Sequence, residues 1–387
     1  MTTKNEEGLL SGIIVLDMSQ FLAGPMAALR LGDLGARVIK IERPDGGDLC
    51  RRLYLSDTEI GGDSTLFHAI NRGKESFAVN MKDESDLQEL RTLIAKADVV
   101  IQNFRPGVIE RLGLDYASVA AINPRIVYGS ITGYGPDNEW RHFPGQDLLA
   151  QARSGAMWLN GEADDGPVPF GLAVADMLAG NLLVQAILAG LVRRGVTGRG
   201  VHVETSLLEA MVDFQFEVLT THLNDGGRLP KKSAVRNAHA YLAAPYGVYR
   251  CADGWLALAM MPLAKLAPLL DLPALADYTP DDAFQRRDEI KSLIASRLKQ
   301  KAIREWLDIM EPADIWAAEV LDWPKLLQTS AFRQLDMLQT VTRGDGVSVQ
   351  TTASPIRVNG ERAKNGLAAP AIGSQSDKIR AEFIEGR

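Results

Sequence analysis

The fold is decided by residues 12–42, which read GIIVLDMSQFLAGPMAALRLGDLGARVIKIE. An apolar run at each end encloses a helical run, which is the pattern of a strand, a crossover helix and a second strand. Pro25 suits the first turn of that helix, and Gly35 suits the position just after its end. A strand, a helix and a second parallel strand form the repeating unit of α/β proteins.

The same alternation continues along the chain. The pattern predicts helices over 85–95, after Asp176 and from Ser206 to about residue 222, and strands over 98–101, 125–131 and 201–204. Strands that alternate with helices indicate a parallel sheet covered on both faces. We therefore expect an α/β fold whose large domain is Rossmann-like.

The composition changes near residue 223, where glycine, proline and charged residues gather. Apolar and polar residues then alternate over 246–259, as in a hairpin that turns at Asp253-Gly254, and a helical pattern follows over 281–308. A smaller α+β domain is expected there. The sequence thus predicts a large domain over 1–222, completed by a C-terminal segment over 340–387 that has little periodicity, a small domain over 235–330, and linkers over 223–234 and 331–339.

Charge and composition exclude several classes of protein. The 387 residues include 42 basic and 49 acidic ones, a net charge of −7, which argues against nucleic acid as a partner. The start of the chain lacks a secretory pattern, and the most apolar segment, 177–192, is shorter and more polar than a membrane span of about 20 residues. Cys50 and Cys251 lie far apart and suit reduced thiols. We expect a cytoplasmic protein without membrane contact.

Common cofactor and catalytic motifs are missing from the sequence. The turn at 21–25 lacks the GxGxxG pattern, so a nicotinamide oxidoreductase is poorly supported. There is no GxxxxGK[ST] loop and no GxSxG elbow. The histidines are scattered without metal-ligand spacing, so we expect no metal site; they are His68, His142, His202, His222 and His239.

Basic residues follow several of the predicted strands. Loops at the carboxyl ends of parallel strands form the ligand crevice of an α/β sheet, so these cations could converge on one polyanion. Taken one at a time, each is more simply a solvated surface charge. The residues are Arg43, Arg72, Lys74, Arg105 and Arg111.

Six motifs occur in the order and rough spacing seen in the class III CoA-transferases, and the sequence resembles that family. The motifs lie at 15–25, 34–43, 71–74, 103–107, 145–152 and 175–176. The family includes formyl-CoA and carnitine CoA-transferases, with the α-methylacyl-CoA racemases as a sister branch. The resemblance is strong from Leu10 to Glu209 and looser over 249–254. It implies an interlocked homodimer in which each subunit has a large and a small domain.

The resemblance also implies that CoA, as part of the substrate, is the polyanion, and that no cofactor is bound permanently. CoA carries a pyrophosphate and a 3′-phosphate, which a cluster of guanidinium and ammonium groups would bind. Phe104 falls where it would lie beside the adenine. The implied contacts are Arg43, Asn71, Lys74, Asn103, Phe104, Arg105 and Arg111.

Asp176 falls at the nucleophile position of the family. A carboxylate at a helix N-terminus is held ionised by the helix dipole and by free backbone N–H groups. It could attack a thioester, pass through a mixed anhydride, and form an aspartyl-CoA thioester. Without the resemblance, Asp176 would be a helix cap. Asp147 matches an acidic position that supports the nucleophile or the substrate, and a capping role ahead of a helix over 148–153 fits equally well.

The racemase branch is the main alternative. It requires an acid and a base, and its members place histidine where this chain has Gln146, whose amide cannot shuttle a proton. His142 could substitute only if its loop folded back. Transfer of CoA between a thioester and a carboxylic acid is therefore favoured over racemisation and over non-catalytic binding of acyl-CoA.

The acid substrate is less well defined. Leu22 stands where the formyl-CoA branch has glutamine, and residues 236–248 contain no glycine run, so oxalate is not expected. A small polar or dicarboxylic acid is expected instead. Tyr134, between Gly133 and Gly135, could cover the thioester, or the three residues could form an ordinary turn. His239, Tyr241 and Tyr246 could face the acyl group or pack within the small domain.

Overall fold

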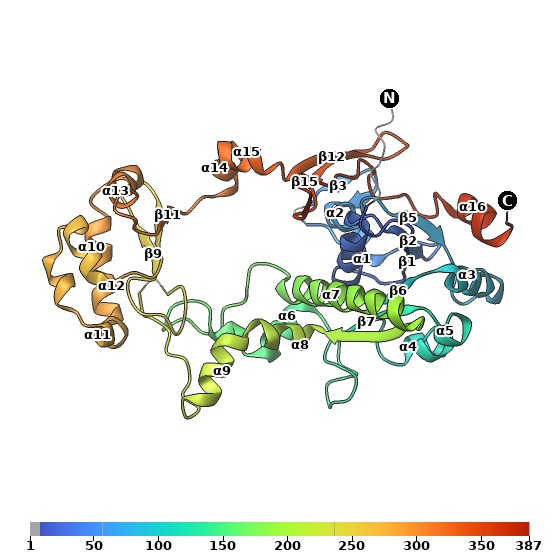
Figure 1. Cartoon of the computed structure of the whole chain (residues 1–387), viewed down its shortest axis with the longest axis horizontal. Coiled ribbons are helices and arrows are strands. Elements are labelled where there is room, and N and C mark those ends of the chain that lie inside the picture. The colour runs from blue at the N-terminus through green and yellow to red at the C-terminus, as the bar shows by residue number, and fades with distance from the viewer. Residues whose placement is uncertain (1–7, 56, 236, 387) are drawn as a thin grey trace. The chain divides into compact units, whose positions relative to one another are not determined.

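The computed structural model describes residues 8–386 except Ser56 and Arg236. It divides into two compact units. The large unit holds residues up to 150, 173–214 and 333 onward, and the small unit holds 151–172 and 215–332. This division differs from the expected one because residues 151–172 and 215–222 belong with the small unit. Figure 1 shows the helices and strands of both.

The large unit is built on one six-stranded sheet in which every neighbouring pair is parallel. The spatial order is β5-β2-β1-β6-β7-β8. Counted along the chain within this sheet, that is the 3-2-1-4-5-6 order of a doubly wound Rossmann fold. The strands are β1 (Ile14–Asp17), β2 (Arg37–Glu42), β5 (Glu75–Ala78), β6 (Val99–Gln102), β7 (Val127–Thr132) and β8 (Val201–Ser206). The predicted parallel α/β sheet is confirmed, and its direction of winding reverses between β1 and β6.

Helices cover both faces of the sheet. On one face, α3 and α5 contribute Leu90, Ile94 and Val119 to a core that also buries Leu16 and Tyr128 of the strands. On the other, α7 packs on β7 so closely that a Cβ on Gly129 would meet Ile187 at 3.0 Å. The helices of the large unit are α1 (Ala23–Asp33), α2 (Thr65–Asn71), α3 (Glu84–Lys96), α4 (Val108–Arg111), α5 (Tyr116–Ile122), α6 (Asp147–Ser154, continuing into the small unit), α7 (Val174–Thr197) and α8 (Leu207–Phe214).

The crossover helix α7 starts earlier than its sequence predicts. Its N-cap is Ala173, so Asp176 lies inside the first turn, and it ends before Gly198, which has a φ of 70°. By length and composition α7 could cross a membrane. It instead buries Ala179, Leu183 and Ile187 as a core helix of the α/β unit.

The small unit contains the predicted hairpin. Strands β9 (Gly247–Arg250) and β10 (Trp255–Leu258) pair antiparallel, and β11 (Ala317–Glu319) extends the sheet. Its core gathers around the buried side chains of Tyr249 and Trp306. The helix predicted to reach residue 222 is broken at Gln215, where α8 ends and α9 begins. The remaining helices are α9 (Phe216–Asn224), α10 (Leu263–Leu270), α11 (Pro280–Gln285), α12 (Arg287–Leu298), α13 (Ile303–Met310), α14 (Trp323–Gln328) and α15 (Ser330–Leu335).

The C-terminal segment has more regular structure than its sequence predicts. It forms a hairpin of β12 (Leu338–Thr342) and β13 (Ser348–Thr352), a short pair β14 (Arg357–Val358) and β15 (Glu361–Arg362), and helix α16 (Ser376–Ile379). Beyond the hairpin it lies along the edge strand β5, where the backbone N–H of Ser76 donates to Gln375 Oε1 (2.8 Å) and that of Ala78 to Ser376 Oγ (3.0 Å). This segment therefore protects an otherwise open edge of the sheet.

Candidate active site

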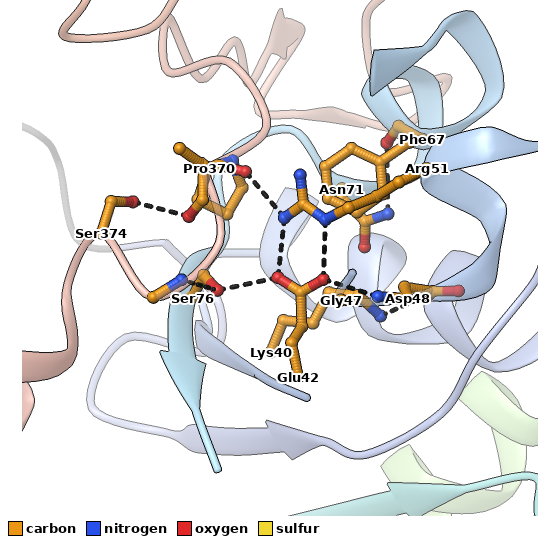
Figure 2. A network of polar contacts seen from close by, with 12 residues as sticks. Lys40, Glu42, Gly47, Asp48, Arg51, Phe67, Asn71, Ser76, Pro370 and Ser374 are labelled. Atoms are coloured by element: carbon orange, nitrogen blue, oxygen red, sulfur yellow. Dashed lines mark hydrogen bonds and ion pairs between the residues drawn. The ribbon is translucent and has the colours of Figure 1, made fainter. Parts of the chain in front are cut away.

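A buried network of charges fixes the loops at the carboxyl ends of β1 and β2 (Figure 2). Glu42 ends β2 and binds the Arg51 guanidinium through both oxygens, with N···O distances of 2.9 and 2.7 Å. Arg51 also pairs with Asp63 at 2.9 Å, donates to the Pro370 carbonyl at 3.0 Å, and lies 3.7 Å from the centre of the Phe67 ring. Burial alone would raise the pKa of Glu42, but Arg51 holds that pKa below its usual range.

A second buried cation joins the loop after β1 to the loop after β2. Lys40 Nζ lies 2.8 Å from Asp48 Oδ2 and donates to the Ser19 carbonyl at 3.0 Å. Asp48 Oδ1 in turn accepts the backbone N–H groups of Phe21 (3.2 Å) and Cys50 (2.9 Å). The backbone ahead of α1 is thus held by side chains from β2 and from the loop that follows it.

Two of the implied CoA contacts, Lys74 and Asn71, and one further predicted loop cation, Arg72, belong to this interior. Lys74 Nζ donates to Asp17 Oδ2 (2.7 Å), the Pro25 carbonyl (2.8 Å) and Asn71 Oδ1 (2.8 Å), so all three of its protons are used. Lys74 and Asn71 are both buried, and burial lowers the pKa of Lys74 to about 8. Arg72 is buried in a bidentate pair with Asp33. Because none of these groups is presented to solvent, the fold itself accounts for them.

The other cations lie on the surface. Arg43, Arg105 and Arg111 are exposed, and Arg43 donates only to the nearby carbonyl of Gly47 (3.3 Å) among the bonds described. Arg105 and Arg111 flank Gly107 in the segment after β6. This segment follows one of the two strands between which the sheet reverses its winding, and in doubly wound folds that reversal point is the ligand crevice.

Asn103 and Phe104 shape that same segment. The Asn103 amide bonds to both backbone groups of Gln20, at 2.8 and 2.7 Å, and so ties the loop after β6 to the loop after β1. The Phe104 N–H donates to Gln102 Oε1 at 2.8 Å, and its half-buried ring packs against the core. Both residues therefore lie at the expected edge of the sheet and have structural roles there.

Asp147 and Asp176 come together at the start of α7. Asp147 Oδ1 accepts the N–H groups of Ala175 (2.7 Å) and Asp176 (3.3 Å). Asp147 is the first residue of α6, yet the helix end that its carboxylate caps is that of α7. Of the two roles left open for Asp147, these bonds favour the one beside Asp176, through a contact across the fold that sequence spacing could not predict.

The ionisation of Asp176 also differs from the expectation. Burial, and then the charge of Asp147, raise the pKa of Asp176 from 3.8 to about 7. The amides that would have stabilised an ionised Asp176 are occupied by Asp147. Near neutral pH the carboxyl group is thus divided between its acid form and its carboxylate form.

A glycine brings Asp176 close to the start of α1. A Cβ on Gly180 would meet the Ala23 carbonyl oxygen at 2.6 Å, so only glycine allows α7 to approach α1 there. Both helices follow strands of the parallel sheet, so both begin at its carboxyl edge. Asp176 lies one turn ahead of Gly180. Leu22, the residue before α1, packs its half-buried side chain against the Met26 and Phe67 cluster.

Two glycines, Gly133 and Gly145, bring the two ends of the loop ahead of Asp147 into backbone contact. A Cβ on Gly133 would lie 2.6 Å from the Gly145 Cα, so the two backbones cross in contact. Tyr134 is 3% exposed and donates its hydroxyl to the Pro144 carbonyl at 3.0 Å, which favours the ordinary turn among the two roles left open by the sequence. Gln146 and His142 are exposed on this loop.

The remaining aromatic and histidine candidates lie in the small unit. His239 Nδ1 accepts the Tyr241 N–H at 3.2 Å, and the His239 ring meets that of Tyr246 edge-on. These contacts favour the packing role among the two left open by the sequence. Within residues 8–386, Ser56 and Arg236 apart, no cluster of three His, Cys, Asp or Glu side chains could hold a metal ion.

Comparison with known proteins places these features in context. The sequence model of CoA-transferase family III matches residues 10–376. The succinyl-CoA:glutarate CoA-transferase of Mus musculus is 35% identical over 79% of this chain and 70% of its own. The acetyl-CoA:oxalate CoA-transferase of Acetobacter aceti is 30% identical over 99% and 97%. The crystal structure of a CAIB/BAIF family protein from Brucella suis superimposes with a TM-score of 0.84 at 31% identity, covering 98% of this chain and all of that one.

Proposed function

Because the chain belongs to CoA-transferase family III, enzymes that transfer CoA between thioesters and carboxylic acids, we propose that Asp176 carries the transferred CoA as an aspartyl thioester. The observation that supports this most is the placement of Asp176. It lies half-buried in the first turn of α7, at the carboxyl edge of the sheet, with Asp147 on the amides beside it.

The reaction would begin with the ionised Asp176. A carboxylate oxygen attacks the carbonyl carbon of the acyl-CoA, the C–S bond breaks, and the CoA thiolate leaves with the electron pair. The thiolate then attacks the Asp176 carbonyl of the mixed anhydride and expels the donor acid as its carboxylate. The acceptor carboxylate reverses these two steps, and Asp176 is regenerated as a carboxylate.

The negative charge of Asp147 would affect this reaction by raising the pKa of Asp176. Asp147→Asn keeps an oxygen for the amides of Ala175 and Asp176 but removes the negative charge that helps raise the pKa of Asp176. We expect kcat/KM to rise with pH around an apparent pKa near 7 in the natural enzyme, and this pKa to fall in the variant. A pH profile of both proteins tests it. An unchanged acidic limb in the variant would contradict the coupling.

The exposed arginines supply the CoA site in this proposal. Arg43, Arg105 and Arg111 present positive charge near the reversal point of the sheet, while Lys74 and Asn71 keep the loops in place from inside. Arg105→Ala is expected to raise the KM for acyl-CoA about tenfold and to change kcat little, because a phosphate contact made in both ground and transition states is lost.

Arg91→Ala is the matched control for that variant. Arg91 is a surface residue of α3 that pairs with Glu84 at 2.6 Å. Its loss should leave the KM for acyl-CoA unchanged, and added salt should weaken binding in the natural enzyme more than in Arg105→Ala. An equal rise of KM in both variants would contradict a specific role for Arg105.

The acid substrate, the assembly and the location remain parts of the proposal. Two relatives are named for transfer of CoA to glutarate and to oxalate, which are both dicarboxylic acids. Their names support a dicarboxylic acid as the acid substrate of this chain. We infer a homodimer of interlocked subunits from the family resemblance, and a cytoplasmic location from the sequence pattern and the two reduced cysteines. Racemisation is disfavoured because Gln146 cannot shuttle a proton.

Isotope exchange tests the proposed function. The enzyme is incubated with an acyl-CoA donor and its own isotopically labelled free acid, without any second acid. A ping-pong transferase should incorporate label into the thioester, and a panel of dicarboxylic acids should then identify the acceptor. Solvent deuterium entering the α-carbon without any such incorporation would favour the racemase alternative.

A further inference from the structure

Phe21, in the loop between β1 and α1, has a backbone conformation that its residue type does not favour. Its φ is 65°, in the left-handed region. In the part of the chain that the structure describes, every other non-glycine residue with positive φ is Asp or Asn, whose short polar side chains tolerate this region. A phenylalanine there is strained, and strain of this kind persists only where surrounding contacts impose it.

The contacts that hold the Phe21 backbone in this strained conformation come from three sides. The Phe21 N–H donates to Asp48 Oδ1 at 3.2 Å, and Lys40 Nζ holds the Ser19 carbonyl at 3.0 Å. Between them, the Asn103 amide bonds to both backbone groups of Gln20. Lys40 and Asp48 are themselves buried and paired, so the loop is fixed by a rigid framework.

Packing does not explain the strain. The Phe21 side chain is 44% exposed, so its ring is not held in the core, while the next residue, Leu22, packs against the interior. The framework thus fixes the backbone so that a large apolar ring projects at the surface. This is a costly arrangement for a side chain that is 44% exposed, and it favours a ligand for the ring.

The location identifies that ligand. Phe21 lies between the carboxyl ends of β1 and β6, where doubly wound sheets bind ligands. Asp176 is four residues ahead of Gly180, about 6 Å along α7, and Gly180 touches Ala23 at the start of α1. Phe21 and Asp176 therefore both lie on segments that start helices at the carboxyl edge of the sheet, and these two helices touch near their starts.

We propose that the Phe21 ring forms a wall of the pocket for the carboxylic acid and limits the bulk of the acids that Asp176 can accept. This inference rests on the proposed CoA transfer and adds the residue that sets its selectivity. A small acid fits between the ring and Asp176, whereas a branched or aromatic acid collides with the ring.

The test compares acceptor acids of different bulk in the natural enzyme, Phe21→Ala and Phe21→Gly. The ratio of kcat/KM for a bulky acid to that for a small dicarboxylic acid should rise about tenfold or more in both variants, because the space of a whole ring is opened. Phe21→Gly should also have a Tm about 2 °C above that of Phe21→Ala, since both variants lack the ring and only glycine adopts the left-handed region without strain. Phe214→Ala is the control, because Phe214 is a 49% exposed phenylalanine at the end of α8 whose φ is not positive.

The outcomes separate this inference from the proposed function. If the natural enzyme transfers CoA but the ratio in Phe21→Ala stays within twofold of its natural value, Phe21 is not a selectivity residue. A Tm for Phe21→Gly no higher than that of Phe21→Ala would overturn the claim of strain. If the natural enzyme transfers CoA to no acid, the proposed function itself fails.

Discussion

Asp176→Asn is expected to lower the rate of CoA transfer by about 10³-fold or more, because an amide cannot form the anhydride and thioester that the mechanism requires. Asparagine is nearly the same size as aspartate, so the variant should fold normally. Transfer is measured with the donor and acceptor identified by isotope exchange. Asp213→Asn, which changes an exposed acid on α8, should retain full activity.

The same variant is expected to be more stable than the natural protein above neutral pH. The pKa of Asp176 is raised to about 7 in the fold, so the folded chain binds more protons than the unfolded chain between about pH 4 and 7. Stability therefore falls as pH rises through this interval, and the loss is complete above the folded pKa. Asparagine does not ionise, so the variant avoids this loss. Its free energy of unfolding should exceed that of the natural protein by about 1 to 3 kcal/mol at pH 8.

Urea unfolding at pH 5 and pH 8 measures this effect. The gain of Asp176→Asn over the natural protein should be larger at pH 8, and Asp213→Asn should show no such difference. Equal gains at both pH values would mean that Asp176 is not held near neutrality by its surroundings. Lower activity combined with higher stability is the signature of a residue retained for chemistry.

Arg51→Met should cost about 3 to 5 kcal/mol of unfolding free energy, because it leaves Glu42 buried without its bidentate partner. Glu42 would keep only the bonds from Ser76 Oγ (2.7 Å) and the Asp48 N–H (3.0 Å). The loops after β1 and β2 depend on this network, so activity should fall as well. Urea unfolding at pH 7 gives the value.

Two further variants make that prediction specific. Arg91→Met removes an arginine from a surface pair with Glu84 and should cost less than about 1 kcal/mol. Arg51→Met combined with Glu42→Met removes both charges and should recover part of the lost stability, because a buried carboxylate is no longer unpaired. A double variant as unstable as the sum of its single variants would show that the charge left by Arg51→Met is not the cause.

Much of the fold could be predicted from local patterns. The sequence 12–42 contains the β1–α1–β2 unit in full, and the hairpin at Asp253-Gly254 was expected for the same reason, since each depends on residues close in the chain. The structure in the C-terminal segment was missed because its strands are short and its binding to β5 depends on residues 299 positions away.

The candidate site was predictable only in part. Asp176 and Asp147 were identified through the family resemblance, but their shared helix end and the raised pKa of Asp176 come from contacts across the fold. Lys74 and Arg105 carry the same charge. Lys74 is buried with three hydrogen-bond acceptors whereas Arg105 is exposed, and no sequence pattern distinguishes these two environments. Phe21 gave no signal at all, since its strain is imposed by residues that follow other strands.

The most direct test of the account is mass spectrometry of the peptide that contains Asp176 after brief incubation with an acyl-CoA donor and rapid quenching. The account predicts a mass increase equal to CoA minus water on Asp176, dependent on the donor and reversed by the acceptor acid. Rapid transfer with CoA attached to another residue, or with Asp176→Asn fully active, would contradict it.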